Sequence, residues 1–171
     1  RSMLRNHELS LFQKVLLATD GTVTDLIALY AGEPIGVRKL AQSIRDEHAP
    51  APLQCTGPTR LLSRSILLTG STRTYLYAES MFVLDRLSTT IQRQMLETDR
   101  PIGLLWKEAR LETFREIVGH AVEPCAAIAG HFDLPVSAPF VSRTYLIHHG
   151  GRPMGMITEQ WPLSHFREQL A

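Results

Sequence analysis

The sequence has little cysteine. Only Cys55 and Cys125 occur among 171 residues, in dissimilar surroundings and with no C-x-x-C spacing. This usage favours free thiols in a reducing compartment, and a disulfide between the two is the less favoured alternative.

Long apolar runs are also lacking. No window reaches the roughly 18 uncharged apolar residues that suggest a membrane-spanning helix, and residues 1–5 lack the apolar core of a signal peptide. With 18 basic and 17 acidic side chains the formal net charge is +1, which gives no general field for nucleic acid or an anionic membrane. We therefore predict a cytoplasmic enzyme or ligand-binding domain without nucleic-acid or membrane partners.

Common cofactor and nucleophile motifs are missing as well. The chain has no G-x-x-x-x-G-K-[ST], no G-x-G-x-x-G after a strand and no G-x-S-x-G. His148 and His149 are the only close histidine pair, and adjacent strand residues point to opposite faces, so we interpret them as hairpin-end residues and not as metal ligands. What remains is a metal-free and cofactor-free pocket of arginine, a carboxylate and backbone amides.

The length, with 44% hydrophobic residues, suits a single domain over residues 1–171. Thr22 or Thr24 is placed to cap one short helix, and residues 110–121 fit either a helix or a strand. The apolar spacing predicts helices over residues 9–19, 25–30, 88–97 and 124–132, strands over 61–68 and 74–83, and a loop over the proline-containing segment 48–59.

Arg64 lies within one of these strands. Leu62, Arg64 and Ile66 share a face, so the arginine is flanked by apolar side chains. An arginine in this position is either an edge residue whose head reaches solvent or a placed ligand for an anion.

A second strand pair is expected around Gly150-Gly151, because glycines supply the positive φ angles of a tight hairpin. Glu159 falls late in the second strand, within an otherwise apolar run. A carboxylate in a half-buried strand is unfavourable unless it is paired or used in chemistry. The alternative is a surface-facing carboxylate paired with Arg143 or Arg152.

Four blocks of the sequence resemble the chorismate pyruvate-lyase family, the enzymes that make 4-hydroxybenzoate. They occur in the family's order, and their details resemble its actinobacterial branch. The blocks are Thr19-Asp-Gly-Thr-Val-Thr24, Leu62-Ser-Arg-Ser-Ile-Leu-Leu68, Tyr77–Leu87 with Arg100-Pro-Ile-Gly103, and the hairpin Arg143–Phe166.

The resemblance implies an α+β fold with a single antiparallel β-sheet of about six strands. It also implies helices and helical flaps that cover a buried ligand site. By this analogy residues 110–118 form a strand.

The resemblance also implies roles for particular residues. Arg64 matches the arginine that grips the ring carboxylate, and Glu159 matches the glutamate that meets the ring hydroxyl. Val23 and Ile102 match positions whose backbone N–H groups hold the same carboxylate.

Other positions follow from these matches. Gly103 continues the second amide site, and Thr22, Thr24 and Thr158 are candidate substrate contacts whose simpler interpretation is as caps and strand residues. Two charged residues are weaker candidates: Arg143 is either a ligand of the pyruvyl carboxylate or a solvated arginine, and Glu79 stands where enterobacterial members have an arginine, which argues against an anion site there.

The implied function is a cofactor-independent lyase that converts chorismate to 4-hydroxybenzoate and pyruvate. A related fold occurs in the effector-binding domains of transcription regulators, but a DNA-binding domain of roughly 70 residues would have to precede it, and the first block begins at Thr19. A third interpretation is a non-catalytic relative that binds a phenolic acid. Glu159 acts as an acid/base group, or else it only orients the ring while hydrogen transfer is intramolecular.

Overall fold

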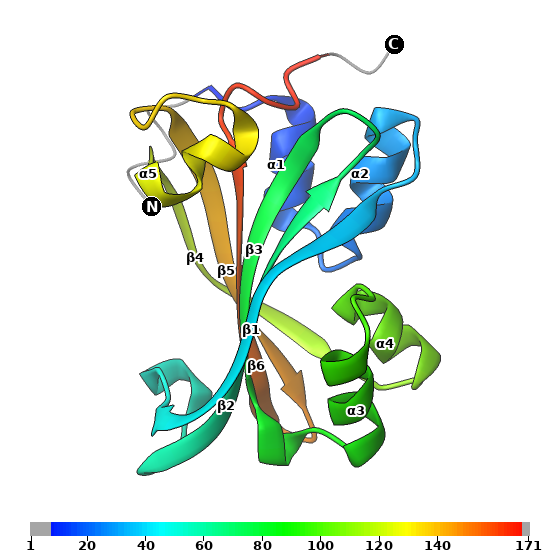
Figure 1. The fold of residues 1–171 in the computed structure, drawn as a ribbon, viewed down its shortest axis with the longest axis vertical. Coiled ribbons are helices and arrows are strands. Elements are labelled where there is room, and N and C mark those ends of the chain that lie inside the picture. Colours follow the sequence, from blue (N-terminus) through cyan, green and yellow to red (C-terminus); the bar gives the residue numbers. More distant parts are fainter. Residues whose placement is uncertain (1–7, 169–171) are drawn as a thin grey trace.

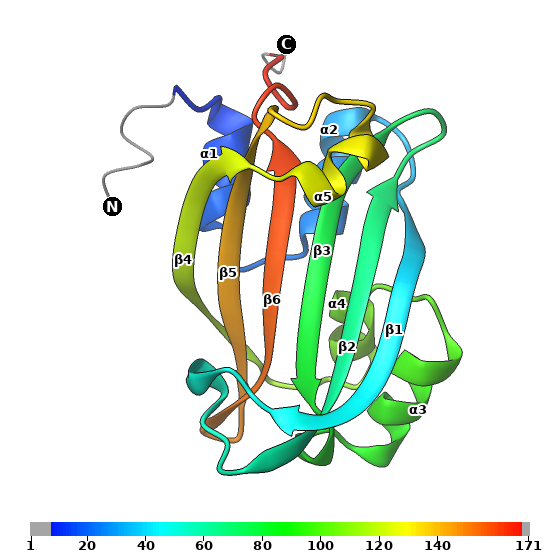
Figure 2. The ribbon, with the colours of Figure 1, turned by 60° about the vertical axis from the view of Figure 1, so that its left-hand side comes forward.

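A single antiparallel sheet of six strands forms the centre of the molecule (Figures 1 and 2). The computed structural model describes residues 8–168. The strand order is β1-β2-β3-β6-β5-β4, and every neighbouring pair is antiparallel. The strands are β1 (Gly36–His48), β2 (Pro58–Thr69), β3 (Thr74–Val83), β4 (Phe114–Pro124), β5 (Pro139–His149) and β6 (Arg152–Pro162). The predicted α+β fold is confirmed.

The helices are short, and they cover both faces of the sheet. Four of them, α1 to α4, lie over one face of the sheet, and α5 lies over the other (Figure 1). Their bounds are α1 (Leu11–Ala18), α2 (Val23–Ala31), α3 (Thr89–Glu97), α4 (Ile102–Glu108) and α5 (Ala126–Ala129), with 3-10 turns at Ala51–Leu53, Leu84–Arg86 and Gly130–Phe132.

Strand alternation divides the core into separate clusters. On the first face, α1 and α2 pack against Leu68 and Leu76 at one end of the sheet, and α3 and α4 pack against Leu62 and Phe82 at the other end. On the second face α5 packs against Leu67 and its neighbours. The middle of the first face therefore lies between two helix pairs.

Local sequence signals explain the ends of α1 and α2. Ser10 and Gln13 form a capping box at the start of α1, so this helix begins two residues inside the predicted segment. Gly32 ends α2 in the left-handed conformation, at φ 68°. Thr22 occupies the N-cap position of α2, but its side chain makes no capping hydrogen bond. The expected cap is correct in position but not in its bonding.

The structure resolves the ambiguous segment and adds a helix. Phe114–Pro124 is a strand that pairs along its length with β5. The apolar residues of this segment fit the spacing of a helix and of a strand equally well, so the pairing with β5 decides its structure. Helix α4 was not predicted from the sequence. It has seven residues, too few to show a helical period, and Pro101 at its N-cap offers no side-chain cap.

The cysteines and the hydropathy of the helices complete the description of the fold. Cys55 and Cys125 are free cysteines. Across residues 8–168, no helix is long and apolar enough to cross a membrane.

Candidate active site

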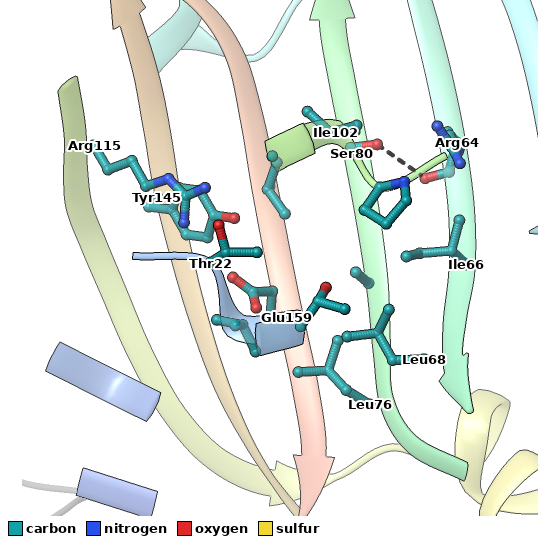
Figure 3. A pocket seen from close by; sticks show the side chains of 16 residues that line it. Thr22, Arg64, Ile66, Leu68, Leu76, Ser80, Ile102, Arg115, Tyr145 and Glu159 are labelled. Carbon is teal, nitrogen blue, oxygen red and sulfur yellow. Dashed lines mark hydrogen bonds between the residues drawn. The ribbon is translucent and has the colours of Figure 1, made fainter. Parts of the chain in front are cut away.

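A cavity lies on the first face of the sheet, between the two helix pairs (Figure 3). Its floor comes from β2, β3, β5 and β6, and its walls come from the first residues of α2 and α4 and from one side chain of β4. The lining residues are Thr22, Val23, Thr24, Arg64, Ile66, Leu68, Leu76, Ala78, Ser80, Pro101, Ile102, Gly103, Arg115, Tyr145, Ile157 and Glu159.

The sheet register brings Arg64 and Glu159 to the same face. Arg64 pairs with Ser80, Ser80 pairs with Ile157, and Glu159 lies two residues further along β6 than Ile157. The Cα atoms of Arg64 and Glu159 are therefore about 10 Å apart across the strands and about 7 Å apart along them. Two long side chains at this separation can contact the two ends of one small ring.

Arg64 is buried without an acidic partner. The residue is only 3% exposed, and its Nη2 donates to the carbonyl of Arg100 at 3.3 Å. Within residues 8–168, its Nε and Nη1 have no hydrogen-bond acceptor. The nearby carboxylate of Asp99 is instead paired with Lys39 at 2.8 Å. A buried cation with free donors is unfavourable on its own and suits a bidentate anion.

The pKa of Arg64 shows the same imbalance. Burial lowers the pKa of the guanidinium from its ordinary value, and the charge of Asp99 opposes this shift. A guanidinium stays protonated in proteins, so the cavity keeps a positive charge at this end.

Glu159 is buried and paired. It is 4% exposed, and its Oε1 accepts from Arg143 Nε at 3.3 Å and from Arg143 Nη2 at 3.1 Å. Pairing with Arg143 was one of the alternatives from the sequence, but the surface-facing position that went with it is wrong.

Arg143 differs from both expectations for it. The residue is 1% exposed, so it is not solvated, and its third guanidinium nitrogen, Nη1, donates to the carbonyl of Thr19 at 2.7 Å. All three nitrogens are bound within the protein. Arg143 does not line the cavity and supports Glu159 from behind.

Tyr145 lies beside Glu159 and was not identified from the sequence. Burial, followed by the negative charge of Glu159, raises the pKa of its hydroxyl, so the phenol is protonated at neutral pH. The guanidinium carbons of Arg115 and Arg143 lie 5.2 and 5.0 Å from its ring centre, within cation–π range. Tyrosines are common in the buried positions of strands, so the sequence alone does not distinguish Tyr145 from an ordinary core residue.

The starts of α2 and α4 meet at the cavity. The first helical bonds are donated by Leu26 to Thr22 and by Leu104 to Pro101, which leaves the N–H groups of Val23 and Ile102 without helical partners. A Cβ placed on Gly103 would lie 3.3 Å from Thr22 Oγ1, so the two helix starts are in close contact. Free N–H groups at two helix starts favour a negatively charged group between them.

Thr158 is not brought to this cavity. It precedes Glu159 on the same strand and so points to the opposite face, where its hydroxyl lies 2.9 Å from that of Thr144. It lines an open groove there together with Glu79 and Met81. Thr158 therefore does not contact a ligand that is bound at Glu159, because neighbouring residues of a strand point to opposite faces of the sheet.

Metal ligands are not gathered anywhere in residues 8–168, where no group of three His, Cys, Asp or Glu side chains could hold an ion. His148 Nε2 lies 2.8 Å from Glu116, and His149 Nδ1 lies 2.9 Å from the carbonyl of Glu112. Both histidines end the β5 strand next to the hairpin turn, as the sequence predicts.

The fold and the cavity together define a class: an α+β domain with a cavity on one face of its sheet that holds a buried arginine and a buried carboxylate. Sequence comparison identifies the family. A family model described as "Chorismate pyruvate-lyase Rv2949c-like" matches residues 17–169. The chain belongs to the Rv2949c-like chorismate pyruvate-lyase family, which confirms the resemblance seen in the sequence.

Curated relatives carry the same name. A protein named chorismate pyruvate-lyase from Mycobacterium leprae (strain TN) is 35% identical over 161 residues, which span 91% of this chain and 76% of the relative. A protein of that name from Mycobacterium tuberculosis (strain CDC 1551 / Oshkosh) is 29% identical over 164 residues, which span 91% of this chain and 81% of the relative.

Solved structures also resemble this fold. PhnF from Mycobacterium smegmatis superposes with a TM-score of 0.69 at 13% identity, over 90% of this chain and 68% of that chain. The effector domain of the same protein gives a TM-score of 0.65 at 14% identity, over 83% of this chain and 88% of that chain. At such low identity the likeness is one of fold alone.

Proposed function

We propose that the protein is a chorismate pyruvate-lyase that converts chorismate to 4-hydroxybenzoate and pyruvate. Membership of the family and the name of its curated relatives support this activity. The observation that carries the proposal is the buried pair of Arg64, with two unpartnered donors, and Glu159, on one face of the sheet and in one cavity.

In this proposal Arg64 binds the ring carboxylate. Its Nη1 has no acceptor and its Nη2 donates to only one carbonyl, so the two terminal nitrogens offer a planar fork that matches two carboxylate oxygens. The free N–H groups of Val23 and Ile102 complete the anion site, and Thr22, Thr24 and Gly103 shape it. Apolar side chains such as Ile66 and Ile157 contact the ring faces.

Glu159 acts at the opposite end of the ring, where the hydroxyl lies. Aromatisation breaks the bond between the ring carbon and the ether oxygen and removes the hydrogen from the neighbouring carbon that bears the hydroxyl. We propose that Glu159 accepts this hydrogen as a proton, and that the released enolpyruvate takes up a proton at its methylene carbon and becomes pyruvate. Atoms and electrons then balance without water, an oxidant or a reductant.

The separation of the two charged groups also supports a para product. The carboxylate and the hydroxyl of 4-hydroxybenzoate lie at opposite ends of the ring, and Arg64 and Glu159 lie apart across the cavity, on β2 and β6 (Figure 3). Arg143 keeps Glu159 oriented through two hydrogen bonds to one oxygen.

We further propose that residues 1–171 act as one domain in the cytoplasm. The cavity is lined by residues of α2, β2, β3, α4, β4, β5 and β6, which lie between Thr22 and Glu159 in the sequence, so one domain must supply them together. Two free cysteines suit a reducing compartment.

One assay tests the proposed function. Purified protein is incubated with chorismate alone, and the aromatic acid and pyruvate are identified and quantified by chromatography. We expect 4-hydroxybenzoate and pyruvate in equal amounts. Folded protein that binds 4-hydroxybenzoate but produces neither compound would instead be a binding domain.

A further inference from the structure

We infer that Arg115, stacked on Tyr145, binds the carboxylate of the enolpyruvyl arm of chorismate and thereby favours the dianionic substrate over the monoanionic product. This inference rests on the proposed function and deepens it. It assigns a second anion subsite to a residue that sequence reasoning did not single out.

The charges around the cavity leave Arg115 without a carboxylate partner. Among the described residues, Glu159 is the only acidic side chain that lines the cavity, and it is already bound to Arg143. Arg64 and Arg115 therefore remain as two unbalanced cations. 4-Hydroxybenzoate brings one carboxylate, which Arg64 satisfies, whereas chorismate brings two.

The strand order places Arg115 at the correct end. Arg64 lies on β2, Glu159 on β6, Tyr145 on β5 and Arg115 on β4, so Arg115 lies beyond Glu159 on the side away from Arg64 (Figure 3). In chorismate the ether is attached to the ring carbon next to the one that bears the hydroxyl. With the hydroxyl at Glu159 and the ether carbon on the β5 side of the ring, the arm reaches toward Tyr145 and Arg115.

The guanidinium of Arg115 is held in place but keeps free donors. Its Nη1 donates to the carbonyl of Gly21 at 2.9 Å, and its Cζ lies 5.2 Å from the centre of the Tyr145 ring. Its Nη2 lies 3.9 Å from the Cβ position of Gly103, at the start of α4. Hydrogen bonds from its Nε and Nη2 to acceptors within residues 8–168 are not present. A planar group fixed in this way loses little freedom when it binds a carboxylate.

The competing explanation is structural: Arg115 would only tie β4 to the loop at Gly21. The two explanations differ in which ligand they affect. A structural role alters binding of substrate and product together, whereas a subsite for the arm alters only ligands that carry the second carboxylate.

The test compares Arg115→Gln and Arg115→Lys with Arg152→Gln, a control at an exposed position of the β5–β6 hairpin outside the cavity. For Arg115→Gln we expect the KM for chorismate to rise roughly 10- to 100-fold, the loss typical of one hydrogen-bonded charge pair. We expect the Kd for 4-hydroxybenzoate, measured by calorimetry, to change by less than about twofold. Arg115→Lys should fall between, because it keeps the charge and loses the fork.

A second ligand pair serves if Arg115→Gln does not fold. 4-Hydroxybenzoate is compared with its 3-carboxymethoxy derivative, which carries a second carboxylate on an ether next to the hydroxyl. We expect wild-type protein to bind the dicarboxylate more tightly and Arg115→Lys to lose most of that preference. Equal binding of the two ligands by the wild type would overturn the inference.

The outcomes separate this inference from the proposed function. If the wild type turns over chorismate and Arg115→Gln has an unchanged KM, the subsite is wrong and the lyase activity stands. If the wild type forms no 4-hydroxybenzoate, the proposed function itself fails. An equal loss of affinity for chorismate and 4-hydroxybenzoate would assign Arg115 the structural role.

Discussion

At the scale of single residues, three buried or half-buried arginines on one face of the sheet have different partners. Arg143 is satisfied by Glu159 and Thr19, and Arg115 donates to the carbonyl of Gly21. Arg64 has two donors with no acceptor in residues 8–168. Arg64 therefore opposes stability in the free protein, and Arg143 supports it. In the proposed function, ligand binding and not folding accounts for the guanidinium at position 64.

The same substitution at positions 64 and 143 should have different effects on stability. Arg64→Met removes an uncompensated buried charge, so we expect the free energy of unfolding to stay equal or to rise by up to about 4 kcal/mol while binding of 4-hydroxybenzoate is lost. Arg143→Met leaves Glu159 buried without its partner, so we expect a loss of about 3–5 kcal/mol. Urea unfolding measures both. Equal destabilisation by the two variants would contradict the account of Arg64.

Glu159→Gln tests whether the carboxylate takes part in the chemistry. The amide keeps the shape of the side chain but cannot accept the ring hydrogen, so we expect kcat to fall by about 10²- to 10⁴-fold. Circular dichroism checks that the variant is folded, and product formation is followed with chorismate in excess. Turnover close to that of the wild type would leave Glu159 only an orienting role and favour intramolecular transfer.

Sequence reasoning reaches some of these residues and not others, for a physical reason. Arg64 and Glu159 stand out because a charge in an apolar strand needs an explanation. Which arginine pairs with Glu159, and which faces the cavity, depends on cross-strand register, which the sequence does not express locally. Arg115 therefore lies in the segment that fits either a helix or a strand, and Thr158, a candidate substrate contact from the sequence, points to the face opposite to Glu159.

At the scale of elements, the cavity depends on how closely two helix starts approach. The starts of α2 and α4 touch at Thr22 and Gly103. The hairpin and the β2–β3 pair could be predicted because their turns and alternation are local signals. Helix α4 could not, because its seven residues are fixed by packing of Leu105 and Trp106 and not by a cap.

Gly103→Ala tests this contact. The new methyl group would lie 3.3 Å from Thr22 Oγ1 and 3.5 Å from Thr22 Cγ2, which forces the helix starts apart by a few tenths of an ångström. We expect affinity for 4-hydroxybenzoate to fall several-fold although alanine favours the helix by about 0.5–1 kcal/mol. Thr22→Ala in the same chain removes both contacting atoms and should restore affinity, with Thr22→Ala alone as the control. Failure of the double variant to recover would show that the contact does not set the cavity.

At the scale of the whole molecule, the two helix pairs are separate clusters that share the sheet and the cavity between them. A ligand held by residues of both pairs and of the sheet stabilises only the folded arrangement. The overall α+β architecture was predictable from the resemblance and the strand pattern. The position of the cavity between the helix pairs required the tertiary structure.

Global stability should also depend on pH through His165. Burial, followed by the charge of Arg73, lowers its pKa to about 4, and its ring packs against Phe132 and Phe166. The unfolded chain, with a histidine pKa of about 6.5, binds the proton more readily, so stability is present above pH 6.5 and is lost as the pH falls toward 4. This group alone contributes a slope of at most about 1.4 kcal/mol per pH unit.

The measurement is urea unfolding between pH 7 and pH 4 for the wild type and His165→Asn. We expect the wild type to lose stability more steeply than the variant over this range. Parallel curves would show that His165 titrates alike in the folded and unfolded states.

The most direct test of the central claim is a crystal structure with 4-hydroxybenzoate bound. We expect the carboxylate within about 3 Å of the guanidinium nitrogens of Arg64, and the hydroxyl at the same distance from the Glu159 carboxylate. A product bound outside this cavity, or turned so that its carboxylate faces Glu159, would contradict the account.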